Sequence, residues 1–157
     1  MSFSESAWEI FNQSINDYHL KDDVDTPINN SFEKNTLEWL LYAKNWIDTV
    51  QWHLEDIIRD ENIEPLEALK IKRRIDSSNQ QRTDLVEFID SWFLQKYENI
   101  TPEPDAKINS ETPAWAVDRL SILALKVYHM SLEANRSSAT EEHRFNCTNK
   151  LNVLLEQ

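Results

Sequence analysis

Apolar residues recur every three or four positions over most of the chain, which is the spacing of helices that bury one face. The first such stretch runs from about Ser4 to Tyr18, and the second starts near Asn30 or Ser31 and ends near Arg59. A third begins at Pro65, because proline suits a first helical turn, and continues to about Tyr97. The short turn between the second and third stretches predicts two long helices in an antiparallel hairpin.

Two more helices are predicted in the C-terminal third of the chain. Thr112 is placed to cap a fourth helix that starts at Pro113. This helix is apolar on nearly all sides, so we expect it to lie centrally in a bundle. Ser138 and Glu141 have the spacing of a capping box for a last helix that ends near Leu155.

The composition supports the same fold class. The chain has 157 residues, the size of one domain, and contains no glycine. Phosphate-binding loops and dinucleotide fingerprints need glycine, so the sequence excludes these motifs. Tight β-hairpin turns favour glycine strongly, so its absence disfavours hairpins. We therefore predict one all-α domain over residues 1–157, with four core helices, a shorter N-terminal helix, and connecting loops at about 19–29 and 99–112.

Charge and cysteine content bound the partners and the compartment. The formal net charge of −12 disfavours binding to nucleic acid or to an anionic membrane surface. Cys147 is the single cysteine, so no disulfide forms within the chain. The sequence has neither the pattern of a signal peptide nor an apolar run of about 20 residues. These features predict a cytoplasmic protein.

Polar side chains interrupt the apolar faces of the three long helices. We estimate that Asp48 lies level with Ser77 across the hairpin, which brings several of these groups into one region. Buried polar residues also fix register in bundles without any ligand, so a purely structural role remains open. The predicted catalytic residues are Asp48, Asp76 and His129, and the predicted ligand-binding residues are Asn45, Trp52, Glu55, Arg59, Asn79, Gln80, Arg82, Arg119 and Lys126.

Three strings carry a family resemblance: WHLEDIIRD, KRRIDSSNQQRTDLVEFID and ETPAWAVDRLSILALKVYHM. They resemble the signature blocks of a bacterial family known as domain of unknown function 4254, over roughly residues 32–130. The resemblance implies a small helical bacterial protein and brings no activity with it. It also implies genes near those of glycosyltransferases. The signature residues it implies are Glu55, Asp56, Arg59, Asp76, Asn79, Gln80, Arg82, Asp84, Glu87, Asp90, Asp118, Arg119 and Lys126.

Metal chemistry finds little support in local spacing. No histidine follows a glutamate at the i, i+3 spacing of di-iron bundles, and His143 with Cys147 provides only two ligands. Glu87 and Asp90 match half of the motif of all-α nucleotide pyrophosphatases, but Glu55 would lie roughly 24 Å away along the hairpin. A dimer would be needed to unite them. We assign no metal ligand and identify no cofactor from the sequence.

The function hypothesis that follows is a polar pocket between helices that binds a small anionic ligand bearing phosphate or carboxylate. Acid–base or magnesium-assisted turnover would be an extension of that binding. The alternative is an interaction protein that forms a homodimer or docks on a partner such as a glycosyltransferase. Its support is an aromatic surplus that one small core cannot hold: Trp39, Trp46, Trp92 and Phe93.

Overall fold

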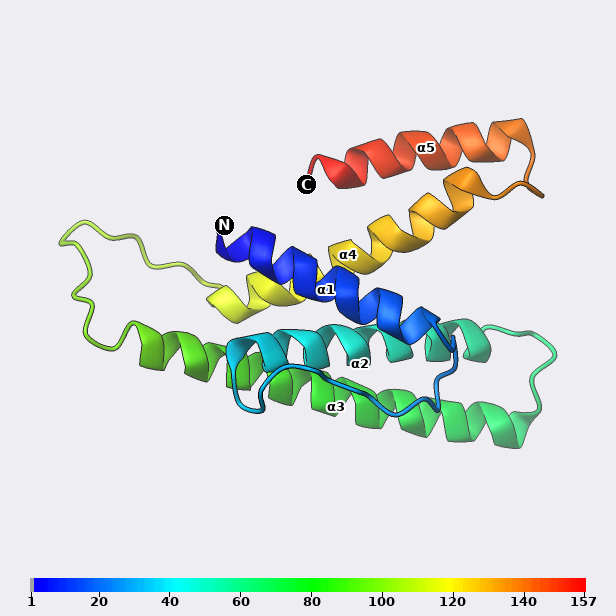
Figure 1. Ribbon diagram of the computed structural model, residues 1–157. Helices are drawn as coiled ribbons and strands as arrows, with labels where there is room; N and C mark the ends of the chain where they lie inside the picture. Colours follow the sequence, from blue (N-terminus) through cyan, green and yellow to red (C-terminus); the bar gives the residue numbers. More distant parts are fainter. Residues whose placement is uncertain (1) are drawn as a thin grey trace.

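The computed structural model describes residues 2–157, and within them it contains five helices and no strand (Figure 1). The protein is therefore all-α, as predicted. The helices are α1 (Phe3–His19), α2 (Leu37–Ile58), α3 (Pro65–Lys96), α4 (Pro113–Asn135) and α5 (Glu141–Leu155). None of these helices is both long enough and apolar enough to cross a membrane.

The helices are arranged around the predicted hairpin of α2 and α3. Figure 1 shows α1 and α4 crossing the same side of this hairpin, and α5 lying along α4 on the side away from it. The chain enters α4 beside the C-terminal part of α3, where the Ala114 backbone N–H donates to Asp90 Oδ1 at 3.1 Å. α4 therefore runs antiparallel to α3, which places its first half over the middle of the hairpin.

The predicted start of α2 was wrong, because residues 30–35 are not helical. The Asn30 side chain stabilises an irregular path there: its Nδ2 donates to the Trp39 carbonyl at 2.9 Å, and its Oδ1 accepts from the Phe32 N–H at 3.1 Å. Asn35 then adopts a left-handed φ of 69°. Thr36 caps the helix by accepting from the Trp39 N–H, so α2 begins at Leu37.

The other helix ends follow the sequence more closely. α3 begins at Pro65 and α4 at Pro113, as predicted. Thr112 occupies the N-cap position of α4, but its side chain makes no capping hydrogen bond. The capping box predicted for α5 was wrong: Thr140, not Ser138, caps this helix by accepting from the His143 N–H. A Thr two residues later competes for the same role, and local spacing alone does not decide between them.

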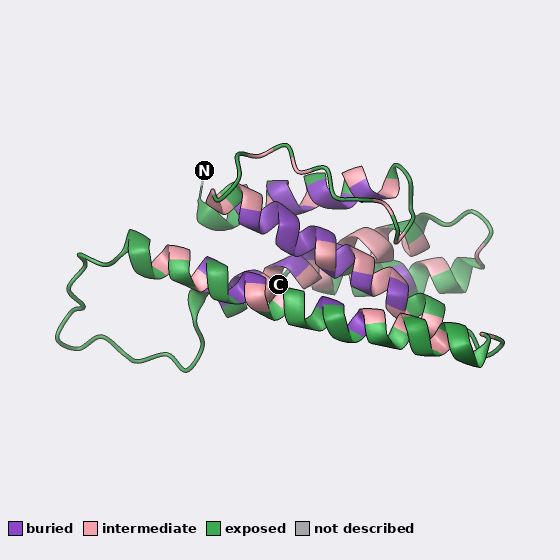
Figure 2. Cartoon of the chain, turned by 90° about the horizontal axis from the view of Figure 1, so that it is seen from below, coloured by how far each residue is buried: buried purple, intermediate pink, exposed green. Residues whose placement is uncertain are grey.

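The core is built around α2, which has the most buried residues of any helix (Figure 2). The prediction that α4 is the central helix was therefore wrong. All the buried residues of α4 lie between Ala114 and Leu125, in its first half. Its second half diverges from the hairpin and packs along α5, so the apolar side chains there are only partly covered.

The predicted aromatic surplus divides between the core and its margin. Trp46 is buried, and Trp39 and Phe93 pack against the core while partly exposed. Trp92 is half-buried, and the Lys96 ammonium lies 4.9 Å from the centre of its ring. These aromatic side chains thus extend the core outward along α2 and α3.

Candidate functional site

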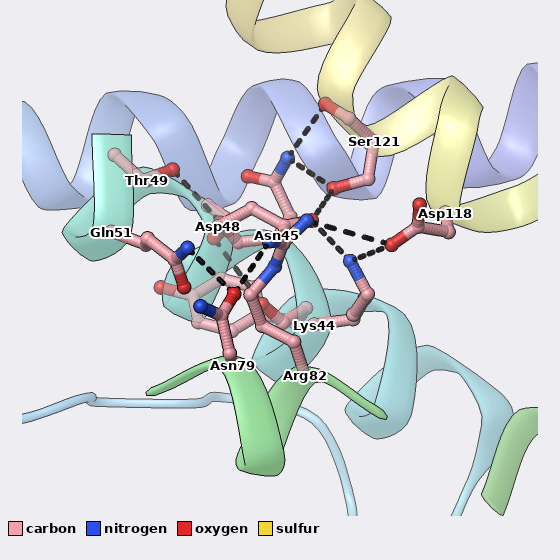
Figure 3. A network of polar contacts seen from close by, with 11 residues as sticks. Lys44, Asn45, Asp48, Thr49, Gln51, Asn79, Arg82, Asp118 and Ser121 are labelled. Carbon is pink, nitrogen blue, oxygen red and sulfur yellow. Dashed lines mark hydrogen bonds and ion pairs between the residues drawn. The ribbon is translucent and has the colours of Figure 1, made fainter. Parts of the chain in front are cut away.

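A network of buried charges lies where α2, α3 and α4 meet (Figure 3). Lys44 and Asp48 stand one turn apart on α2, and both side chains are completely buried. The Lys44 Nζ atom lies 2.5 Å from Asp48 Oδ2 and 2.7 Å from Asp118 Oδ1 on α4. A lysine without solvent contact needs such partners, because an unpaired buried charge costs several kcal/mol.

Arg82 and Ser121 complete the environment of Asp48. The Arg82 Nε atom donates to Asp48 Oδ1 at 2.5 Å, and its Nη2 atom lies 3.7 Å from Asp118 Oδ1. The Ser121 hydroxyl donates to Asp48 Oδ2 at 2.6 Å. Both oxygens of Asp48 are thus held by hydrogen bonds from residues of three helices.

Amide side chains surround the charges on two sides. Asn45 Nδ2 donates to Ser121 Oγ at 3.0 Å, and Gln51 Nε2 donates to Asn79 Oδ1 at 2.8 Å. Arg82 Nη1 also approaches Asn79 Oδ1, at 3.4 Å. Among residues 2–157, the buried oxygens Asn45 Oδ1 and Gln51 Oε1 have no hydrogen-bond partner.

A structural role accounts for the inner part of this network without any ligand. The two cations Lys44 and Arg82 match the two anions Asp48 and Asp118, so the formal charge of the group is zero. Their contacts join α2 to α3 and to α4 at one level only, which specifies the register of the three helices. This accounts for the Arg82 guanidinium and the Asn79 amide among the apolar residues of α3.

The outer part of the network forms the wall of a small pocket of about 190 Å³. The Arg82 side chain is 23% exposed, unlike the buried Lys44 and Asp48. Ile122 of α4 closes one side, and Trp52 closes another. The lining residues are Asp48, Gln51, Trp52, Glu55, Arg59, Arg82 and Ile122. The pocket therefore combines two guanidinium groups with an aromatic wall and a buried carboxylate.

Two larger pockets adjoin this one. A pocket of about 590 Å³ between α2, α4 and α5 shares Trp52 with it, and a pocket of about 540 Å³ along α4 shares Ile122. Lys126 lines both of the larger pockets. Any two of these three pockets therefore have a lining residue in common.

The structure brings four predicted site residues into the network and three more to its pocket. Asn45, Asp48, Asn79 and Arg82 belong to the network. Trp52, Glu55 and Arg59 line the pocket beside it, although Arg59 is largely exposed and pairs with Asp56.

The remaining five predicted residues lie elsewhere. Asp76 pairs with Lys72 and Gln80 bonds to Asp84, in both cases on exposed positions of α3. Arg119 forms an exposed pair with Glu111, whose hydrogen bond from the guanidinium lowers the pKa of that carboxyl. Lys126 and His129 line the 590 Å³ pocket, where the His129 ring stacks on Trp52 at 4.8 Å.

The three predicted catalytic groups thus fall into separate surroundings. Asp48 is inside the network, Asp76 is on the exposed face of α3, and His129 lies beside Trp52. Burial, together with the neighbouring His53 and His19, lowers the pKa of His129 to about 4. This ring is therefore neutral near pH 7, and it makes no hydrogen bond to Asp48 or Asp76.

The estimated register was wrong by about one helical turn. Asp48 lies level with Arg82, not with Ser77, and Asp118 with Ser121 reaches this level from α4. Lys126 and His129 lie beyond this level, toward the C-terminal end of α4.

Four residues of the network were missed in the sequence: Lys44, Gln51, Asp118 and Ser121. They did not fall on the chosen stripes, and lysine is rarely buried. The useful signal was Lys44 with Asp48 at i, i+4 inside an otherwise apolar run. Asp118 appeared in the sequence analysis only as a signature residue that the family resemblance implies.

Comparison with known proteins identifies the family. The sequence model of the family described as "Protein of unknown function (DUF4254)" matches residues 38–157. The chain belongs to this family. The match covers α2 to α5 from the second residue of α2 onward, and so contains every residue of the buried network. No curated protein and no solved structure matches the chain.

Proposed function

We propose that this DUF4254 protein binds a small anionic ligand, bearing phosphate or carboxylate, in the pocket between α2, α3 and α4. The observation that carries the proposal is the state of Arg82. Its Nε atom is fixed by the buried Asp48 carboxylate at 2.5 Å, while the side chain remains 23% exposed at the pocket wall.

Arg82 has donors to spare in this position. A guanidinium carries five N–H groups, and it binds phosphate and carboxylate through pairs of them. The terminal nitrogens make only long contacts here, 3.4 Å to Asn79 Oδ1 and 3.7 Å to Asp118 Oδ1. Because the buried Asp48 already orients the group, binding an anion would cost little side-chain entropy.

The pocket limits the size and chemistry of what enters it. A volume of about 190 Å³ is below the roughly 300 Å³ of common ligand sites, so only part of a drug-sized molecule fits. Arg59 offers a second guanidinium at the rim, and Trp52 offers a flat apolar wall. Gln51 also lines the pocket and adds an amide side chain to its wall. A phosphate or carboxylate on a hydroxylated body fits these features.

The proposal is binding without turnover. Asp48 already accepts from Lys44, Arg82 and Ser121, so most of its lone pairs are engaged within the protein rather than directed at a substrate. Asp76 and His129 lie in other surroundings. A ligand-bound magnesium ion could still lie near Glu55, which is the reason to include magnesium in the test.

A thermal-shift screen with a matched pair of variants tests the proposal. The compounds are inorganic phosphate, sugar phosphates, nucleotides, nucleotide sugars and dicarboxylates, each with and without magnesium. A ligand at 100 times its Kd stabilises the fold by about 2.7 kcal/mol, which is a clear shift. Arg82→Met should abolish the shift, while Arg73→Met, on an exposed position of the same helix, should keep it.

Two results would contradict the proposal. One is undiminished binding by folded Arg82→Met protein, which would place the site elsewhere. The other is the absence of a shift with every anion, which would leave Arg82 with a structural role only.

A second candidate is protein association through α5. This helix packs along α4 and buries only Cys147, while Phe145, Val153 and Leu155 are each more than half exposed. A homodimer or a glycosyltransferase partner would cover them. Sedimentation of the purified chain distinguishes a monomer from a homodimer. A monomer at micromolar concentration would rule out the homodimer. A bacterial, cytoplasmic setting remains part of either proposal, supported by the acidic composition and the lone cysteine.

A further inference from the structure

Three of the four histidines converge although they come from different parts of the chain. His19 is the last residue of α1, His53 lies in α2, and His129 lies in α4. One ring nitrogen of each lies within 4.8 Å of the others. The Nε2 atoms of His19 and His53 are only 3.2 Å apart. All three side chains are partly buried, so this is a built cluster rather than a chance meeting on the surface.

We propose that His19, His53 and His129 bind one divalent transition-metal ion of the Zn²⁺ class, with the Asp22 carboxylate as the fourth ligand. Asp22 Oδ1 lies 3.7 Å from His53 Nε2 and 3.9 Å from His19 Nε2. Imidazole nitrogen and carboxylate oxygen form typical zinc sites, whereas Mg²⁺ and Ca²⁺ prefer oxygen ligands alone.

The spacing of the donor atoms suits one ion. Tetrahedral zinc with Zn–N bonds of about 2.0–2.1 Å sets its ligand atoms roughly 3.3 Å apart. His19 and His53 already have this separation, at 3.2 Å. Asp22 Oδ1, at 3.7 and 3.9 Å from these two nitrogens, is about 0.5 Å too far from them, and the His129 nitrogen, within 4.8 Å, has to move inward by at most roughly 1.5 Å; side-chain rotations supply such shifts.

The hydrogen bond at the far side of His19 prepares it as a ligand. His19 Nδ1 lies 2.7 Å from the Ile15 carbonyl oxygen, which can only accept. The proton is therefore on Nδ1, and Nε2 presents its lone pair to the cluster. A backbone carbonyl in this position is the usual outer partner of a metal-bound histidine, because it fixes both the tautomer and the ring orientation.

The cluster is incompletely satisfied by the protein alone. His129 Nε2 is buried and has no hydrogen-bond partner among residues 2–157. A bound cation would give His129 Nε2 a partner and would replace the 3.2 Å hydrogen bond between the Nε2 atoms of His19 and His53.

The surroundings hold the donors in place. The His53 ring stacks on Tyr18 at 5.1 Å, and the His129 ring stacks on Trp52 at 4.8 Å. Asp22 has a left-handed φ of 52°, and its N–H donates to the Tyr18 carbonyl at 3.0 Å. This turn at the end of α1 brings the carboxylate back beside His19 and His53. An aspartate held in a sparsely populated conformation next to such a cluster is consistent with a ligand role.

The proposed metal site has no ligand in common with the Arg82 pocket, although Trp52, which lines that pocket, stacks on His129. The fourth histidine of the chain belongs to a different group of side chains. His143 on α5 contacts Glu133 at 2.8 Å and Cys147 at 3.4 Å, a more exposed group that is the natural rival for metal. His143 therefore supplies the matched control.

The experiment is a titration of the chelator-treated full chain with Zn²⁺ and Co²⁺, followed by calorimetry and by visible absorption. We expect one ion per chain and the intense visible bands of tetrahedral Co²⁺. His53→Ala should weaken binding on the order of 100-fold, as loss of a direct ligand exceeds the 10–100-fold loss of an outer partner. His143→Ala should leave the affinity unchanged. In wild-type protein with nitrogen-15-labelled histidine, zinc should shift the resonances of His19, His53 and His129 but not those of His143.

The labelled wild-type experiment decides the matter even where His53→Ala fails to fold. Absence of stoichiometric zinc binding, or resonances that shift only for His143, would overturn the proposal. Loss of binding in His143→Ala with retention in His53→Ala would do so as well. Asp22→Asn, an exposed change, should weaken zinc binding several-fold while the three histidine shifts persist, which separates the fourth ligand from the other three.

Discussion

Arg82 of α3 and Asp48 of α2 are joined by a 2.5 Å bond between Nε and Oδ1 that links the protein core to its surface. The carboxylate is completely buried, whereas the Arg82 side chain is 23% exposed in the pocket wall. Because Asp48 also binds Lys44 and Ser121, the position of the exposed guanidinium depends on groups from three helices. Changes in the buried part should therefore affect both stability and the pocket.

Replacing Lys44 by methionine should strongly destabilise the fold. The change removes the partner of Asp48 and Asp118 and leaves negative charge in a buried place, a loss of roughly 3–5 kcal/mol. Urea unfolding followed by circular dichroism would measure it. Lys70→Met, an exposed lysine paired with Glu67, should change stability by less than about 0.5 kcal/mol.

A double variant sharpens this test. Lys44→Met with Asp118→Leu removes one charge of each sign, so Asp48 keeps Arg82 as its counter-ion. Apolar replacement of a buried pair is often neutral, and much of the lost stability should return. Equal instability of the double and single variants would mean that packing, not charge, dominates at Lys44.

Removal of the Ser121 hydroxyl should cost less. Ser121→Ala leaves Asp48 Oδ2 without one donor and Asn45 Nδ2 without its best acceptor, about 1–3 kcal/mol in all. The measurement is again urea unfolding. Ser91→Ala on α3, where the exposed hydroxyl bonds only to the Glu87 carbonyl, should be close to neutral. A neutral Ser121→Ala would show that water replaces the hydroxyl.

The sequence predicted the fold because its signals were local. Pro65 and Pro113 mark helix starts through their fixed φ and missing N–H, whatever the rest of the chain does. The start of α2 failed for the opposite reason. Asn30 bonds to the backbone of Trp39, nine residues later, and such contacts are invisible to a local pattern.

The candidate sites depend still more on long-range geometry. Asn45, Asp48 and Arg82 were predicted as neighbours because they interrupt apolar stripes, yet a shift of one turn between helices changed which residues faced them. The histidine cluster gave no signal at all. Its members are 34 and 76 residues apart in sequence, and only the packing of α1, α2 and α4 brings them together.

α5 should be the least protected helix in hydrogen exchange. It has one buried residue, Cys147, whereas α2 has eleven, so α5 can open without disrupting the core. Mass-spectrometric exchange on dilute protein should show α5 amides exchanging well before those of α2. Equal protection in the two helices would contradict this expectation and indicate that a partner or second copy covers α5.

Metal-free protein should lose stability as the pH falls below about 6.5. The pKa of His129 is lowered to about 4 by burial and by the neighbouring His53 and His19, against weaker opposing effects of Asp56 and Asp22. Burial and His19 lower the pKa of His53 as well. Between the unfolded value of about 6.5 and the folded values, the unfolded chain binds more protons, so acid favours unfolding. Partial exposure of both rings limits the total effect to on the order of 1–2 kcal/mol.

Urea unfolding at pH 7.5 and pH 5, in the presence of a chelator, tests this sign and size. Most carboxylates stay charged in that range, so the histidines should dominate the change in the free energy of unfolding. His129→Asn should flatten the dependence because the residue no longer titrates. His143→Asn, at a histidine outside this cluster, is the control and should leave the loss of stability at low pH in place. If the free energies of unfolding of wild-type and His129→Asn protein change in parallel from pH 7.5 to pH 5, the prediction is contradicted. Protonation of His129 would then not destabilise the fold.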